Sequence, residues 1–146
     1  GRDTLDGGTE NDSLLGGADD DLLIGGQGDD RLYGGTGNDD LRGNAGADRF
    51  VFDKAPGAGN IDMLDFNVID DTIMLDDAIF ALPTGVLAAA RFHIGASAHD
   101  ADDRITYNSG TGALWYDADG NGGGAALQFA IVPTGLALTA ADFIVF

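Results

Sequence analysis

The chain has 146 residues, of which 25 are acidic and 7 are lysine or arginine, giving a formal net charge of -18 at pH 7. This length allows one or two small domains with a limited hydrophobic core. The negative charge argues against nucleic acid and anionic membranes as partners, and the lack of cysteine in the sequence excludes disulfides and thiolate metal sites.

Residues 1–51 form a repeat with a period of nine. Each copy has an aspartate followed two places later by an apolar residue, and the aspartates are Asp3, Asp12, Asp21, Asp30, Asp39 and Asp48. The glycine pair that opens most copies favours a tight turn, and the three residues after the aspartate suit a very short strand. Two copies therefore predict one coil of eighteen residues in a parallel solenoid. Asp3, Asp21 and Asp39 then stack along one edge, and the other three aspartates stack along the opposite edge.

The stacked turns have the spacing and the oxygen atoms that a calcium ion needs. Coils about 4.8 Å apart place an ion roughly 2.4 Å from each turn, which fits calcium and is too long for magnesium. Carbonyl groups that point alternately up and down the stack, with one aspartate from each turn, supply the ligands. Besides the six aspartates, the candidate ligands are Gly7, Thr9, Asn11, Gly16, Ala18, Asp20, Gly25, Gly26, Gln27, Gly28, Asp29, Gly35 and Gly37.

About three to four calcium ions are expected, because each column of three turns encloses two gaps and the turn before Asp3 is incomplete. Glu10 and Asp19 stand where other copies have glycine, and Asn44 replaces a second-position glycine, so their turns are expected to bind more weakly. A flexible, acidic, glycine-rich linker is the competing interpretation of this composition. The apolar residue at every ninth position argues against it.

Beyond Phe52 the glycine period stops and other elements are predicted. Alternation of acidic and apolar residues indicates strands over 61–66 and 71–75. Asp76 and Asp77 are placed to cap a short helix over 78–82 that Pro83 ends, and a second short helix is expected over 86–90.

The rest of the chain again favours strands. Segments 104–108, 113–117 and 125–132 predict an antiparallel meander, and Thr139 and Asp142 have capping-box spacing before an apolar end. Because a parallel solenoid cannot leave its last coil bare, residues 52–146 are expected to cap it.

Other candidate sites in this half are weaker. The loop containing Asp117, Asp119 and Asn121 resembles the opening of an EF-hand, but its twelfth position is Gln128, which favours a polar hairpin turn over a further calcium site. His93 and His99 are the sequence's two histidines, and neither lies in an HExxH motif. They are interpreted as structural or surface residues, and no enzymatic activity is expected.

The copies resemble the GGxGxDxUx nonapeptide of the hemolysin-type, or RTX, calcium-binding repeats. This resemblance implies an all-β fold: a right-handed parallel β-roll over 1–51 that orders when calcium binds, followed by a mainly antiparallel β cap over 52–146. It also implies type I secretion to the outside of the cell.

The second half resembles the C-terminal domain of serralysin-type metalloproteases in its segments NIDMLDF, GALWYDADGNG and ADFIVF. The resemblance implies an uncleaved export signal, read by the type I exporter, in Asp142, Phe143, Ile144, Val145 and Phe146. The chain starts inside a repeat, which predicts an upstream domain in the full-length protein. No apolar run is long enough to span a bilayer, and no N-terminal signal peptide is recognised.

The leading functional prediction is a calcium-binding module that folds outside the cell and supports the secretion and stability of a larger exported protein. One alternative is an adhesion or matrix-binding scaffold, which predicts an exposed aromatic patch around Trp115, Tyr116 or Phe129. A second alternative is the non-catalytic C-terminal part of a secreted protease or lipase.

Overall fold

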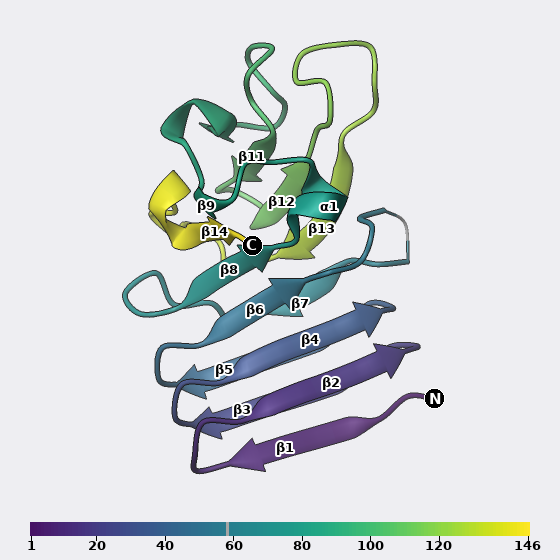
Figure 1. Ribbon diagram of the computed structural model, residues 1–146, viewed down its shortest axis with the longest axis vertical. Coiled ribbons are helices and arrows are strands. Elements are labelled where there is room, and N and C mark those ends of the chain that lie inside the picture. Colours follow the sequence, from purple (N-terminus) through teal and green to yellow (C-terminus); the bar gives the residue numbers. More distant parts are fainter. Residues whose placement is uncertain (58) are drawn as a thin grey trace.

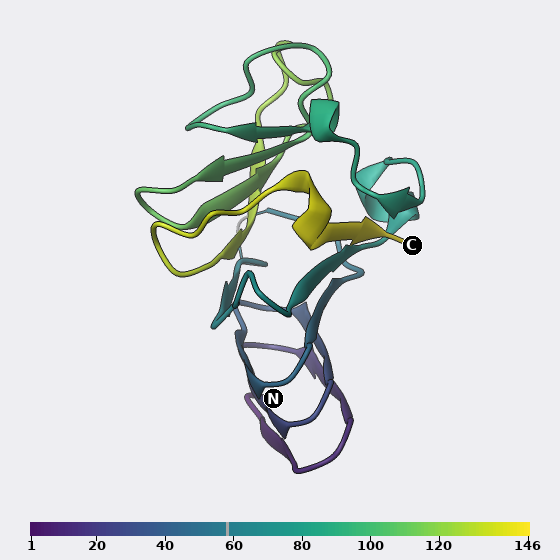
Figure 2. The same ribbon diagram turned by 90° about the vertical axis from the view of Figure 1, so that its left-hand side faces the viewer.

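The computed structural model describes residues 1–57 and 59–146. The chain begins with a series of stacked strands: β1 (Thr4–Gly8), β2 (Ser13–Ala18), β3 (Leu22–Gln27), β4 (Arg31–Thr36), β5 (Asp40–Ala45) and β6 (Arg49–Phe52). β1, β3 and β5 pair in parallel in one sheet, and β2, β4 and β6 pair in parallel in the other. The stack is seen from the side in Figure 1, and Figure 2 shows the two sheets facing each other. This is the predicted parallel β-roll.

The strand register confirms the predicted coil. Leu5 pairs with Leu23, and Leu14 pairs with Leu32, so partners are eighteen residues apart. The strands are longer than predicted, since the two opening glycines of a copy also lie in the strand and the second one pairs, as Gly17 does with Gly35. Gly17 has a φ of 105°, which lets the strand bend toward the turn while its main chain stays paired.

Two further strands extend the roll. β7 (Asp62–Leu64) pairs in parallel with β5, and β8 (Thr72–Leu75) pairs in parallel with β6. The parallel stacking therefore runs through Leu75 and does not end at the predicted division at residue 51.

The cap is built mainly of short strands. It contains α1 (Asp77–Phe80), β9 (Gly85–Val86), a 3₁₀ turn (Ala89–Arg91), β10 (Phe92–Ile94), β11 (Ile105–Asn108), β12 (Ala113–Tyr116), β13 (Leu127–Ile131), a second 3₁₀ turn (Ala140–Asp142) and β14 (Phe143–Val145). β11, β12 and β13 form the predicted antiparallel meander. β13 pairs in parallel with β7 and β14 with β8, so both sheets of the roll continue into the cap.

One predicted helix forms and the other does not. Asp76 caps α1 by accepting a hydrogen bond from the Ala78 N–H, and Ala81 ends it in a left-handed conformation. The helix predicted over 86–90 is wrong at its start, because Val86 lies in β9 and pairs with Ile144 of β14. Tertiary strand pairing outweighs the local helix propensity of this apolar segment. The capping box between Thr139 and Asp142 is present as predicted.

The apolar residues two places after the repeat aspartates fill the space between the two sheets. Leu23, Leu32, Leu41 and Phe50 are fully buried, whereas Leu5 at the open end is half-buried. In the cap, aromatic rings pack edge to face, with centroid distances of 5.0 Å for Phe52 and Phe129 and 5.4 Å for Phe80 and Phe129. One hydrophobic core thus runs from the roll into the cap.

Among the described residues, no helix has the length and apolar character needed to cross a membrane.

Replacing Leu32 by alanine is expected to destabilise the folded protein by about 2–5 kcal/mol, because it opens a cavity between the sheets. Leu15 gives a matched control, since it belongs to the coil before that of Leu32 and is 65% exposed. Urea denaturation at saturating calcium measures both variants. Equal losses of stability for Leu32→Ala and Leu15→Ala would contradict the assigned core.

Candidate metal sites in the stacked turns

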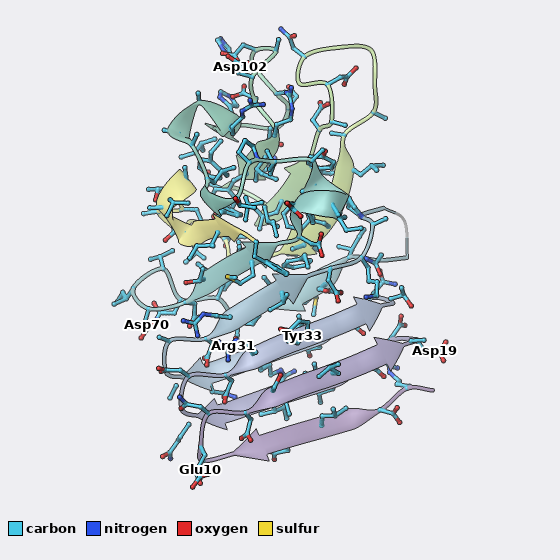
Figure 3. All side chains as sticks on the ribbon, in the orientation of Figure 1. Glu10, Asp19, Arg31, Tyr33, Asp70 and Asp102 are labelled. Atoms are coloured by element: carbon cyan, nitrogen blue, oxygen red, sulfur yellow. The ribbon has the colours of Figure 1, made fainter. Side chains whose placement is uncertain are left out.

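The repeat aspartates are joined by a ladder of hydrogen bonds along each edge of the roll. Asp21 accepts the Asp3 N–H through Oδ1 at 2.7 Å, and Asp39 accepts the Asp21 N–H at 2.8 Å. On the other edge the Asp12 N–H donates to Asp30 at 2.8 Å, and the Asp30 N–H donates to Asp48 at 2.9 Å. The two predicted columns are therefore present. Figure 3 labels Glu10 and Asp19, whose turns lie on opposite edges.

Each column gains one aspartate that sequence analysis did not include. The Asp39 N–H donates to Asp62 Oδ1 at 3.2 Å, and the Asp48 N–H donates to Asp71 Oδ1 at 3.0 Å. Asp62 and Asp71 are nine residues apart, and each has an apolar residue two places later, at Leu64 and Ile73. The period does not reach them, because Asp48 and Asp62 are fourteen residues apart, five more than the period of nine.

The second carboxylate oxygen of the column aspartates is buried and has no hydrogen-bond partner. This holds for Oδ2 of Asp12, Asp21, Asp30, Asp39 and Asp48. In Asp21, Asp30, Asp39 and Asp48, Oδ1 is held by the neighbouring coil, so Oδ2 cannot turn outward without breaking the ladder. A buried carboxylate oxygen without a donor is costly unless a proton or a cation compensates it.

Carbonyl oxygens from the next coil converge on the same points as these carboxylates. A Cβ placed on Gly7 would lie 2.7 Å from Asp12 Oδ2 and 2.8 Å from the Gly25 carbonyl oxygen. On the opposite edge, a Cβ on Gly16 would lie 2.8 Å from Asp21 Oδ2 and 2.6 Å from the Gly34 carbonyl oxygen. The first glycine of a copy thus leaves open a small space lined by oxygen atoms of two coils. Oxygen donors of this kind suit a hard cation such as calcium.

The remaining predicted ligands lie in the turns or at the strand ends beside them. The residue directly before a column aspartate has its own role, because its side chain joins successive coils. Asn11 Oδ1 accepts the Asp29 N–H at 2.8 Å, and Asp20 Oδ1 accepts the Asn38 N–H at 2.9 Å. Two non-glycine residues adopt left-handed conformations in the turns, Asp19 with a φ of 76° and Asn44 with a φ of 66°.

The two columns end differently at the junction with the cap. Both oxygens of Asp71 accept main-chain hydrogen bonds, from Asp48 at 3.0 Å and Asn67 at 2.8 Å. Asp65 accepts the Gly43 N–H at 2.8 Å and the Asn44 N–H at 3.1 Å. This column is thereby closed by carboxylates that are already satisfied.

In the other column, Asp62 lies against Asp39. Burial, and secondarily the charge of Asp39, raises the pKa of Asp62 from 3.8 to about 8. Burial likewise raises the pKa of Asp71 from 3.8 to about 6, and the pKa values of Asp39 and Asp48 are raised for the same reason. Without metal, burial therefore makes these four carboxyl groups harder to ionise.

The EF-hand-like loop forms a hairpin connection between β12 and β13. Asp117 Oδ1 accepts the Asp119 N–H at 3.2 Å, and Asp119 Oδ2 accepts the Gly124 N–H at 3.0 Å. The Asn121 N–H donates to the Asp100 carbonyl at 3.2 Å. These bonds favour the polar turn that sequence analysis preferred here.

Comparison with known proteins gives one family match. The family described as the RTX calcium-binding nonapeptide repeat, in four copies, matches residues 1–32 and 24–53. No curated protein matches the chain. A similar solved structure is the solution structure of the AlgE6R3 subunit of the Azotobacter vinelandii mannuronan C5-epimerase. It is 23% identical to this chain, the alignment covers 94% of this chain and 80% of that one, and the TM-score is 0.42.

The pKa shifts predict an unusual pH dependence for the metal-free protein. An acid whose pKa is raised by folding contributes stability that is fully present below its unfolded pKa and is lost as pH rises through the folded value. Since these folded values are about 6 for Asp71 and about 8 for Asp62, the folded fraction is expected to fall as pH rises from acid to weakly alkaline. Far-UV circular dichroism measured in chelator across this range gives the folded fraction and tests it. Asp62→Asn should flatten the upper part of the profile, whereas exposed Asp70→Asn should not. A folded fraction that rises with pH would contradict the assignment.

Proposed function

Because residues 1–53 consist of RTX calcium-binding nonapeptide repeats, we propose that the two aspartate columns hold calcium ions in the gaps between successive coils. The observation that carries the proposal is the set of buried, unpartnered Oδ2 atoms that face carbonyl oxygens of the next coil. Three ions occupy the gaps between Asp12 and Asp30, between Asp30 and Asp48, and between Asp21 and Asp39. A fourth lies between Asp39 and Asp62.

Calcium acts as a folding switch in this proposal. Extracellular calcium modules bind with dissociation constants of ~10⁻⁴ to 10⁻³ M, so a tenfold excess of calcium adds about 1.4 kcal/mol per site. Four sites together add roughly 5–6 kcal/mol, which is comparable to the whole stability of a small domain. At low calcium the chain, with its net charge of -18, stays unfolded and can be threaded through an exporter.

We further propose that the protein is secreted by the type I route and that its exporter reads residues 142–146 before folding. Phe143 and Val145 are buried in β14, between β8 and β9, and Asp142 belongs to the capping box. An exporter can reach these side chains only while the cap is open. Folding outside the cell then stabilises the upstream domain to which the module is attached.

The aromatic residues give less support to an adhesion scaffold. Tyr116 and Phe129 are buried, and Trp115 is half-buried. An exposed aromatic patch, which that alternative requires, is not formed by these rings.

Calcium titration followed by far-UV circular dichroism tests the calcium proposal. The metal-free chain should gain β signal cooperatively with calcium and not with magnesium. Asp30→Asn should raise the calcium midpoint severalfold, because Asp30 lies between two proposed ions. Asp6→Asn removes an equal charge from an exposed position and should leave the midpoint nearly unchanged. A chain fully folded in chelator at neutral pH would contradict the switch.

Export can be tested separately from calcium binding. Deleting residues 142–146 should abolish secretion by a bacterial host that carries a type I exporter. Replacing both Asp21 and Asp39 with asparagine should leave secretion intact but yield a protein that stays protease-sensitive in calcium. Unchanged secretion of the deletion variant would contradict the proposed signal.

A further inference from the structure

The two histidines of the sequence lie together in the cap, with carboxylates beside them. His93 belongs to β10, and His99 belongs to the loop between β10 and β11. Their rings stack with a centroid distance of 5.5 Å and an interplanar angle of 16°. Asp103 Oδ2 lies 3.9 Å from His93 Nδ1, and Asp100 Oδ2 lies 3.8 Å from His99 Nδ1. Sequence analysis interpreted both histidines as structural or surface residues.

The loop backbone holds both carboxylates in place. Asp100 Oδ1 accepts the Asp102 N–H at 2.9 Å and the Asp103 N–H at 3.3 Å, which leaves Oδ2 directed at His99. Asp103 Oδ2 accepts the His99 N–H at 2.7 Å and the Asp100 N–H at 3.1 Å. The Asp103 side chain is only 8% exposed, whereas that of His99 is 75% exposed, so the group is anchored on one side and open to solvent on the other. Hydrogen bonds of this kind orient metal-binding carboxylates.

We propose that His93, His99, Asp100 and Asp103 bind one borderline divalent transition metal, such as zinc. One ligand atom each of His99, Asp100 and Asp103 lies within 4.8 Å of the others, and His93 adjoins Asp103. Two imidazoles and two carboxylates form a donor set suited to tetrahedral zinc, with metal–ligand distances of about 2.0–2.2 Å. Such a tetrahedron separates its ligand atoms by roughly 3.4 Å. The two imidazole–carboxylate pairs, at 3.9 Å and 3.8 Å, therefore need to close by about half an ångström. The other ligand atoms, which lie up to 4.8 Å apart, need to close further, and His93 has to move toward the other three residues. The imidazole nitrogens disfavour calcium and magnesium, which prefer oxygen donors.

The metal would affect a neighbouring cavity. The same loop contributes Ala96, Ser97 and Ala98 to a cavity of about 390 Å³, and Trp115 of β12 also lines it. The loop is also tied to the β12–β13 connection by the bond from the Asn121 N–H to the Asp100 carbonyl. Zinc would therefore fix one wall of this cavity. Figure 3 places Asp102, in the same loop, at the end of the molecule away from the first coils of the roll.

Zinc titration of the full chain in saturating calcium tests the proposal, with calorimetry giving the stoichiometry and the fluorescence of Trp115 reporting on the cavity wall. Trp115 is the sequence's single tryptophan. One zinc ion is expected to bind with a change in fluorescence, and replacing both histidines with glutamine should weaken binding by at least about tenfold. Asp100→Asn should weaken binding, whereas exposed Asp102→Asn, in the same loop, should not.

Imidazole NMR signals provide a second readout that needs no variant, because each of the two histidine resonances should shift on addition of one equivalent of zinc. Far-UV circular dichroism in calcium verifies that each variant is folded. Zinc binding that persists unchanged in the folded double-histidine variant would show that the histidines are not ligands and would overturn the proposal. The absence of zinc binding to the wild-type protein would also overturn it. Neither outcome bears on the calcium sites, because calcium is saturating throughout.

Discussion

The hydrogen bond from a main-chain N–H to the carboxylate of the equivalent aspartate one coil later governs the roll. It holds successive coils in register, and it fixes each carboxylate so that Oδ2 stays inside the stack. The same bond that assembles the solenoid therefore creates buried negative charge. Apolar packing of residues such as Leu32 and Leu41 favours the stack, while the carboxylates oppose it unless a proton or a cation neutralises them. In the proposed function, calcium binding decides between these two tendencies.

The junction between roll and cap shows how the stack is brought to an end. Asp65 and Asp71 donate no hydrogen bonds when ionised, yet they accept the free main-chain N–H groups of the last repeat. They accept the hydrogen bonds of the final turn that the aspartates of another coil would otherwise accept. At the sheet edges, β13 and β14 take the positions of two further strands beside β7 and β8. The strand edges at this end of the roll are thus paired without a further repeat.

Much of the roll could be predicted from the sequence, because a strict period translates directly into register. The eighteen-residue coil, the two columns and the buried apolar residues two places after the aspartates all follow from it. The period could not reveal Asp62, since an insertion of five residues shifts the register before it resumes. The strand at Val86 and the stacking of the His93 and His99 rings depend on contacts made by the folded cap. Local sequence patterns carry no information on such contacts.

The position of β14 makes the two halves depend on each other. Phe143 and Val145 pair with β8, whose Ile73 and Leu75 close the apolar core of the roll. When residues 142–146 are not docked beside β8, the end of the roll keeps an exposed apolar edge, and β8 lacks its neighbouring strand. Calcium binding between coils requires those coils to be stacked, so completing the cap favours binding, and binding in turn favours the cap. The proposed calcium binding therefore predicts cooperative folding of the whole chain, because the carboxylates oppose stacking of the turns and the apolar end of the roll is uncovered without the cap.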